Sequence, residues 1–221
     1  MNTITKNEKT IKSIDCDTIC PKRKSGKSCR YCYVETARRN KWNSKHLAEF
    51  TEYKGVNFRQ ETIDKLNSVG GIRLFSFSDY KPEHDEKLNK ILDDCLAKGL
   101  KVKAITKQVE FIEKYHNHPA ISVIHVSVDN VGDGVDLKTA KRLRKKYDTV
   151  IIRSVILKDE DLDILAKVSD IVTFNHGNNG FVNYSKQVER MQALIKKFRL
   201  EGKVCCSTEK CISCDVKCKA A

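Results

Sequence analysis

From about residue 70 onward, short apolar stretches rich in branched residues alternate with longer stretches whose apolar residues recur every three or four positions. The first pattern is typical of strands and the second of helices with one buried face. The predicted strands cover residues 71–78, 101–106, 121–128, 149–156 and 171–174, with a weaker one at 10–14. The predicted helices cover residues 34–50, 83–98, 108–115, 137–147, 159–168 and 184–200.

Each of the six predicted strands is followed by a helix, and this regular alternation predicts an α/β fold with a parallel sheet. Six such units form either an open doubly wound sheet or a partial (β/α)6 TIM-like barrel. In both architectures, ligands bind at the carboxyl ends of the strands. We expect one domain over residues 1–200, followed by a short cysteine-rich, metal-binding tail over residues 201–221.

The alternation of side chains within the strands favours the partial barrel. One face is polar and cationic at its centre, and it carries Arg73, Phe75, Phe77, Asp79, Lys103, Ile105, Lys107, His125, Ser127, Asp129 and Arg153. The opposite face suits packing against helices, and it carries Leu74, Val102, Ile124, Val126, Val150 and Ile152. A doubly wound sheet is apolar on both faces, so a barrel whose interior binds a ligand explains the pattern better. A register shift of one residue would exchange the two faces.

Composition adds a basic charge and an unusual number of cysteines. The formal net charge of +13 favours an acidic partner, such as a nucleotide, a nucleic acid or an acidic peptide, although a solvated lysine-rich surface gives the same count. No apolar run is long enough to cross a bilayer, and the first residues lack the apolar core of a secretion signal. Ten cysteines in such a chain indicate a reducing compartment. We therefore expect a cytoplasmic protein, without a membrane partner, whose clustered cysteines bind metal.

The most informative cysteines lie in the loop after the first predicted strand. Cys29 and Cys32 flank an aromatic residue, Tyr31, and Cys20 precedes Cys29 at a distance of nine positions. Three thiolates on one loop hold three corners of a [4Fe–4S] cluster and leave the fourth iron open. Cys16 is an alternative ligand, and a closed zinc site of Cys16, Cys20, Cys29 and Cys32 is the competing interpretation.

With these residues, the chain resembles the radical S-adenosylmethionine (SAM) superfamily, in particular phage-associated members that are similar in style to spore photoproduct lyase. The first gap is wider than the common one, giving C-x8-C-x2-C. Further similar stretches are Cys32-Tyr-Val-Glu35, Ser76-Phe-Ser-Asp79, Ile105-Thr-Lys107 and Val126-Ser-Val-Asp-Asn130, each in the expected order at strand ends.

The resemblance implies an enzyme in which Cys20, Cys29 and Cys32 hold a [4Fe–4S] cluster whose open iron binds SAM. Reductive cleavage of SAM would give a 5′-deoxyadenosyl radical that abstracts hydrogen from a substrate inside the barrel. The electron would come from a reducing partner such as flavodoxin or ferredoxin. The resemblance places the cofactor beside Tyr31, Ser76, Ser78 and Asp79, and gives its ribose and carboxylate contacts to Thr106, Lys107, Ser127, Asp129 and Arg153. Ordinary capping of a strand end explains Ser76 and Ser78 equally.

A second group of cysteines lies in the last 17 residues, where Cys205 and Cys206 precede Cys211, Cys214 and Cys218. The most economical ligand set is Cys206, Cys211, Cys214 and Cys218, with Cys205 as a substitute. A second, auxiliary [4Fe–4S] cluster and a zinc ion both fit these thiolates. Metal binding would supply the folding energy that so polar a tail lacks.

The remaining candidate residues indicate a function less specifically. His125 points into the barrel if the register holds, and His176 follows the last strand, so both are candidates for substrate binding. Cys95 shares a helical apolar stripe and is expected in the core. The basic run of the helix at 137–147 is expected to face solvent. A zinc-stabilised nucleic-acid-binding protein is the alternative function, but aromatic residues are only 7% of the chain, whereas such proteins stack bases on exposed aromatics.

Overall fold

A computed structural model of the chain describes residues 4–5, 13–14, 55–68, 70–75, 79–129, 134–156, 161–174, 192–200 and 203. The strands are β1 (Ile4–Thr5), β2 (Ser13–Ile14), β3 (Ile72–Leu74), β4 (Val102–Thr106), β5 (Ile121–Val128), β6 (Val150–Ile156) and β7 (Ile171–Phe174). The helices are α4 (Gln60–Asn67), the short 3-10 helix η2 (Pro82–His84), α5 (Asp85–Ala97), α6 (Val109–Tyr115), α7 (Leu137–Lys146) and α8 (Leu162–Val168). Residues 192–197 are also helical.

The strands form one sheet whose spatial order, β1 to β7, is their order in the sequence. β1 pairs with β2 in antiparallel fashion, and β2 to β7 are parallel throughout. The prediction of an α/β fold with a parallel sheet is therefore confirmed. The order never reverses, as it would in a doubly wound sheet. Because crossovers between parallel strands are right-handed, a consecutive order puts the connecting helices on one face.

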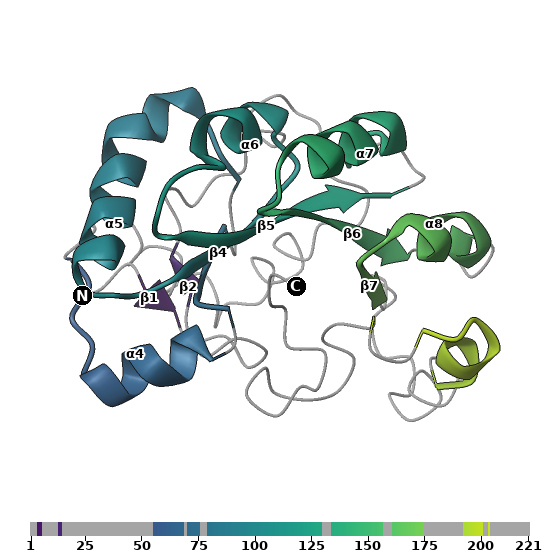
Figure 1. The fold of residues 1–221 in the computed structure, drawn as a ribbon, viewed down its shortest axis with the longest axis horizontal. Coiled ribbons are helices and arrows are strands. Elements are labelled where there is room, and N and C mark those ends of the chain that lie inside the picture. Colours follow the sequence, from purple (N-terminus) through teal and green to yellow (C-terminus); the bar gives the residue numbers. More distant parts are fainter. Residues whose placement is uncertain are drawn as a thin grey trace, which may run out of the picture.

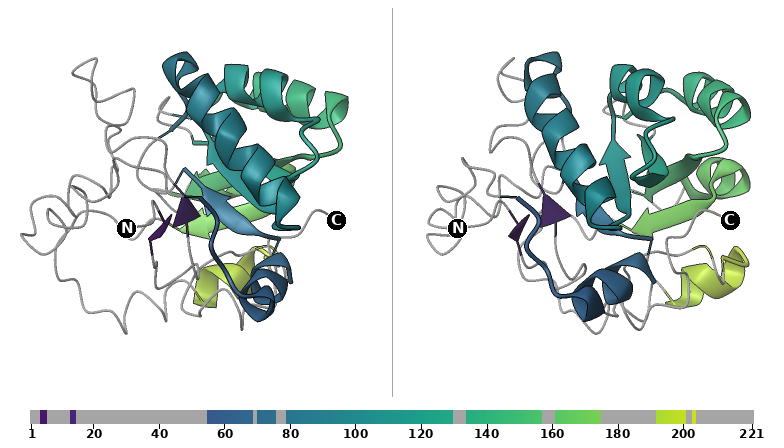
Figure 2. Two further views of the ribbon diagram at one scale, coloured as in Figure 1. Left: turned by 90° about the vertical axis from the view of Figure 1, so that its left-hand side faces the viewer. Right: turned by 60° about the vertical axis from the view of Figure 1, so that its left-hand side comes forward.

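Figure 1 shows α5, α6, α7 and α8 following one another around the outside of a curved sheet. The views in Figure 2 show the same helices beside one another, with α4 below them. Ile63 and Leu66 of α4 belong to the same hydrophobic cluster as Leu74 and Val102 of the strands, so α4 covers the same face of the sheet. The end of α4 is held at the amino end of β4, because the Asn67 side chain donates to Gly99 O and accepts from Lys101 N, both at 2.8 Å. This contact lies at the edge of the sheet opposite the carboxyl end of β4.

The predicted faces of the strands are confirmed for most positions. The main core lies between sheet and helices and includes Leu74, Val102, Ala104, Ile124, Val126, Val150 and Ile152. A separate small cluster of Val123, Ile151 and Ile171 lies on the other face. Pairing of Arg73 with Lys103, Ile105 with His125 and Ser127 with Arg153 aligns the polar residues in rows on that same face.

Phe75 is the exception among the described residues, and its predicted place on the polar face is wrong. Phe77 lies outside the described residues. Its φ of 64° lies in the left-handed region and ends the extended backbone after Leu74. The Phe75 ring then packs edge-on against Phe111 of α6, with centroids 4.9 Å apart, inside the helix-side core. Positive φ is unfavourable for a bulky residue, so surrounding contacts must stabilise this turn.

Predicted element bounds agree best where both ends carry clear signals. The strands at 121–128 and 171–174 coincide with β5 and β7, and Gly99, with a φ of 65°, ends α5 as the predicted left-handed residue. The strand at 71–78 is shorter, and α4 and β1 were not predicted. The predicted helix at 34–50 and nearly all of the predicted tail at 201–221 lie outside the described residues. Across the described ranges, no helix has the length and apolar character that crossing a bilayer requires.

Candidate functional site

Seven of the site residues predicted from the sequence are described by the structure, namely Asp79, Thr106, Lys107, His125, Ser127, Asp129 and Arg153. The others lie outside the described residues: Cys20, Cys29, Tyr31, Cys32, Ser76, Ser78, His176, Cys206, Cys211, Cys214 and Cys218. The seven described residues fall into two neighbouring groups. One lies at the carboxyl ends of β3, β4 and β5, and the other lies along the polar face of the sheet.

At the carboxyl ends, Asp79 joins the segment after β3 to the end of β4. Its Oδ1 accepts hydrogen bonds from Tyr80 N at 2.8 Å and from the Thr106 hydroxyl. Its Oδ2 accepts a hydrogen bond from Lys107 N at 2.9 Å. The Thr106 hydroxyl accepts in turn from Gln108 N at 2.9 Å, at the residue that precedes α6. Asp79 and Thr106 therefore fix the backbone from which the Lys107 side chain extends.

Burial sets the electrostatics of Asp79, whose side chain is 8% exposed. Loss of hydration raises the pKa of Asp79, and the hydrogen bonds from Thr106, Lys107 and Tyr80 offset only part of that rise. The group is thus a buried acid that accepts from backbone and hydroxyl donors. Such perturbed acids concentrate at functional sites, although structural networks produce them as well.

Lys107 extends the network towards β5. Its Nζ lies 3.9 Å from Asp129 Oδ2, and the Asp129 side chain is fully buried. Gly134 packs closely against the end of β5. A Cβ added at this position would lie 2.7 Å from Ser127 O and 2.9 Å from Asp129 Oδ2. Only glycine fits such an approach, and Val135 N donates to Ser127 O at 2.9 Å beside it. Asp79, Thr106, Lys107 and Asp129 thus form one continuous edge.

The second group runs along the polar face below this edge. His125 and Ser127 occupy successive positions of β5 on this face, and Arg153 pairs with Ser127 from β6. All three are buried, as is Lys103 of β4. Burying several polar and charged groups on one face costs free energy that an apolar core would avoid.

Sequence reasoning missed three residues of this region as site residues. Arg73 and Lys103 were placed on the polar face without a role, and their direct pairing across β3 and β4 could have been inferred from the alternation. Lys81, which follows Asp79 by two positions, is also buried, with its Nζ 3.9 Å from Glu83 Oε1. A lysine beside a proline gives no sequence signal of burial.

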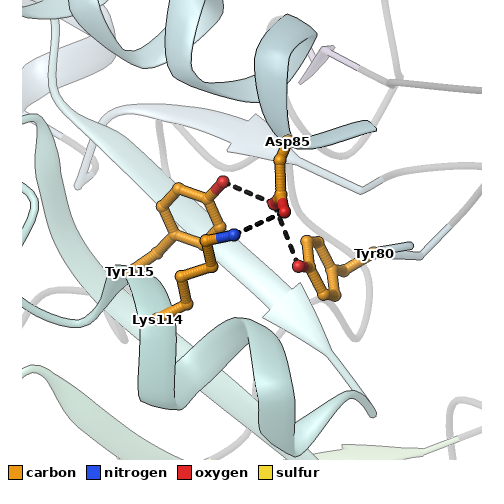
Figure 3. Close-up of polar contacts among 4 residues, drawn as sticks. All are labelled: Tyr80, Asp85, Lys114 and Tyr115. Carbon is orange, nitrogen blue, oxygen red and sulfur yellow. Dashed lines mark hydrogen bonds and ion pairs between the residues drawn. The ribbon is translucent and has the colours of Figure 1, made fainter. Parts of the chain in front are cut away.

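A further polar cluster, shown in Figure 3, surrounds Asp85 at the start of α5. Its Oδ1 accepts from the hydroxyls of Tyr80 at 2.9 Å and Tyr115 at 2.7 Å, and its Oδ2 pairs with Lys114. Burial alone would raise the pKa of Asp85, but these donors outweigh it and lower the pKa. Burial and the same carboxylate raise the pKa of Tyr80. The cluster joins the start of α5 to the end of α6 and is therefore structural.

At the opposite edge of the sheet, Arg144 and Asp170 form a bidentate pair. Arg144 Nε and Nη2 donate to the two carboxylate oxygens of Asp170, each at 2.7 Å, and Ile152 N donates to Asp170 Oδ2 at 2.8 Å. The pair ties α7 to the amino end of β7. In parallel β/α folds this edge serves stability, whereas the carboxyl edge carries function. The other basic residues of α7 (Lys138, Lys141, Arg142, Lys145 and Lys146) are exposed, as predicted.

Among the described residues, no group of three or more histidine, cysteine or acidic side chains could hold a metal ion. Cys95 is the described cysteine, and it is buried in the core as predicted. A search against models of protein families found no match, and a search of curated proteins found none either.

Proposed function

We propose that this protein is a radical SAM enzyme built on a partial (β/α)6 barrel. One observation carries the proposal: the C-x8-C-x2-C run of Cys20, Cys29 and Cys32 follows β2, and β2 is a parallel neighbour of β3. A loop that follows a parallel strand starts at the carboxyl edge of the sheet. The cysteine loop and the edge formed by Asp79, Thr106, Lys107 and Asp129 therefore begin on the same side of the sheet.

The strand order supports the barrel within this proposal. Consecutive parallel strands with helices on one face are the arrangement of (β/α) barrels, and the inner face of such a barrel is where a substrate binds. The polar face with His125, Ser127 and Arg153 would be that inner face. Curvature of the sheet in Figure 1 agrees with this assignment.

The chemistry of the residues fits the cofactors. Soft thiolates are the usual ligands of iron–sulfur clusters, and Cys20, Cys29 and Cys32 would hold a [4Fe–4S] cluster with one open iron. When bound, the cluster supplies the electron that cleaves SAM and yields a 5′-deoxyadenosyl radical. SAM carries an ammonium, a carboxylate and ribose hydroxyls. The Lys107 ammonium and the Asp129 carboxylate complement those groups.

The residues of this chain would then divide the remaining work. Asp79 and Thr106 hold the backbone of Lys107, and Lys107 and Asp129 orient the cofactor. Ser127, His125 and Arg153 would contact cofactor or substrate along the inner face, where burial excludes water from the radical. Cys206, Cys211, Cys214 and Cys218 would hold the second cluster, or a zinc ion. A flavodoxin or ferredoxin would supply the electron.

Metal content and the response of the cluster to SAM test this function. After anaerobic reconstitution with iron and sulfide, we expect an iron–sulfur spectrum that changes in electron paramagnetic resonance when SAM is added. Cys29→Ala should abolish the SAM-dependent change, while Cys95→Ala, which removes a buried core thiol, should retain it. A colourless protein that holds zinc at both cysteine groups would contradict the proposal. That result would favour a zinc-stabilised nucleic-acid-binding protein instead.

A further inference from the structure

The parallel strands β3 to β7 contain three formally cationic residues and no carboxylate. The three, Arg73, Lys103 and Arg153, all lie on the face opposite the helix-side core. Among the described acidic residues, Asp79 and Asp129 follow β3 and β5 at the carboxyl edge, whereas Asp148 and Asp170 precede β6 and β7 at the amino edge. Within these strands, the formally charged residues are therefore all cationic and all lie on one face.

Arg73 and Lys103 occupy paired positions on neighbouring strands. Adjacent strands lie about 4.8 Å apart, so the two side chains leave the sheet side by side. Like charges at directly opposite positions destabilise a sheet, and Lys103 is only 3% exposed, which strengthens the repulsion by removing water. Lys103 also pairs with Val123 of the small apolar cluster, which an apolar residue at position 103 would extend.

Among the buried polar atoms on the same face, Arg73 Nε and Thr173 Oγ1 have no hydrogen-bond partner among the described residues. A buried donor without an acceptor costs free energy, and a guanidinium is well suited to two parallel bonds with a carboxylate or a phosphate. Arg73 itself is half-buried, so its outer part stays within reach of a ligand.

We propose that Arg73 and Lys103 form an anion-binding site for the phosphate or carboxylate group of a small substrate. The two residues supply a planar bidentate donor and a compact ammonium, which together match an oxyanion in shape and charge. Arg153, two strands from Lys103, adds a third positive charge to the same face. The proposal rests on the proposed function, because it assigns the substrate class of that same face.

The position of Lys103 along β4 favours a small molecule over a nucleic acid as the ligand. Lys103 of β4 lies four positions before Lys107, which directly follows the strand, and at the rise of a parallel strand this is about 13 Å below the carboxyl edge. A polymer lying across the edge would place its phosphates near Lys107 instead. A small acidic molecule entering along the face reaches both the edge and the paired cations.

Calorimetric titration of the reconstituted full chain, saturated with SAM, tests the site. The probes are inorganic phosphate and succinate, which distinguish a phosphate group from a carboxylate. We expect one of them to bind. Arg73→Gln should weaken its affinity by about tenfold or more, because the variant loses a charged hydrogen-bonding partner of the anion. Arg73→Lys should weaken it less. Lys138→Gln, an exposed substitution on α7, should leave binding unchanged.

Lys103→Gln is the second variant, and circular dichroism checks that each variant remains folded. Equal binding by wild type and Arg73→Gln, or no binding of either probe, would overturn the anion site. Binding of a single-stranded oligonucleotide that depends on Arg73 would overturn the assignment to a small molecule. SAM cleavage is measured on the same samples: intact cleavage without anion binding rejects only this site, and Arg73-dependent binding without cleavage rejects only the radical SAM function.

Discussion

The Asp79 carboxylate accepts a hydrogen bond from the backbone N–H of Lys107 at 2.9 Å, which fixes the end of β4 against the segment that follows β3. The same carboxylate accepts from Tyr80 N and the Thr106 hydroxyl. The buried Asp79 thus fixes the position of the Lys107 backbone, and the Lys107 side chain extends from there to Asp129. Asp79 is therefore a positioning residue for the proposed cofactor site.

Ionisation of Asp79 should lower the free energy of unfolding as the pH rises. Because burial raises its pKa above the unfolded value of about 4, the folded state holds the proton longer than the unfolded state does. The stability of wild type relative to Asp79→Asn should therefore fall as pH rises from about 4 through the raised folded pKa. Urea unfolding of both proteins between pH 4 and 8 measures this difference. A difference that rises with pH would contradict the expected direction.

Asp170 should show the opposite dependence. Burial opposes ionisation of Asp170, but the donors Arg144 and Ile152 N outweigh it, so the pKa is lowered. The stabilisation by this pair is present above the unfolded pKa of about 4 and is lost as pH falls through the folded pKa. Asp170→Ala should lower the free energy of unfolding at pH 7 by about 1–2 kcal/mol. Asp163→Ala, an exposed acid on α8, is the matched control and should change it little.

The cluster around Asp85 should behave as a unit. Tyr80→Phe and Tyr115→Phe each remove one hydroxyl donor from the same oxygen, and each should cost about 0.5–1.5 kcal/mol. Because the two donors share one acceptor and their rings lie 6.1 Å apart, the double variant should deviate from the sum. Thermal unfolding of the four proteins gives the coupling. Strict additivity would show that the hydroxyls act independently.

Cys95 should be inert to thiol reagents in the folded protein. Burial, followed by the nearby Asp94 charge, raises the pKa of Cys95 to about 12, so almost no thiolate exists at pH 8. Labelling with a disulfide reagent under native conditions should leave Cys95 unmodified, and denaturant should expose it. Mass mapping of the labelled peptides separates Cys95 from the other cysteines. Rapid native modification of Cys95 would mean that α5 opens readily.

The fold could be predicted where local signals and burial agree. β5 runs from Ile121 to Val128 and was predicted at the same bounds, because Pro119 precedes it and branched residues fill it. α4 was missed because only Ile63 and Leu66 of its eight residues are buried, which leaves a short and weak helical stripe. β1 has two residues and is stable only through pairing with β2.

The candidate site could be predicted as a set of residues but not as a network. Alternation placed Lys103, His125 and Arg153 on one face, and the register of the sheet confirms it. The bond from Lys107 N to Asp79 depends on how two strand ends meet, which no local pattern encodes. The positive φ of Phe75 likewise accompanies its packing on Phe111. Because the residue is not a glycine, the sequence gives no signal of this conformation.

The formation of 5′-deoxyadenosine tests the central claim most directly. The anaerobically reconstituted protein is reduced with dithionite in the presence of SAM, and the nucleoside is quantified by chromatography. We predict that wild type and Cys95→Ala produce it and that Cys29→Ala does not, because Cys29 lies in the proposed ligand run and Cys95 does not. No deoxyadenosine from an iron-loaded wild type, or equal amounts from Cys29→Ala, would contradict the radical SAM assignment.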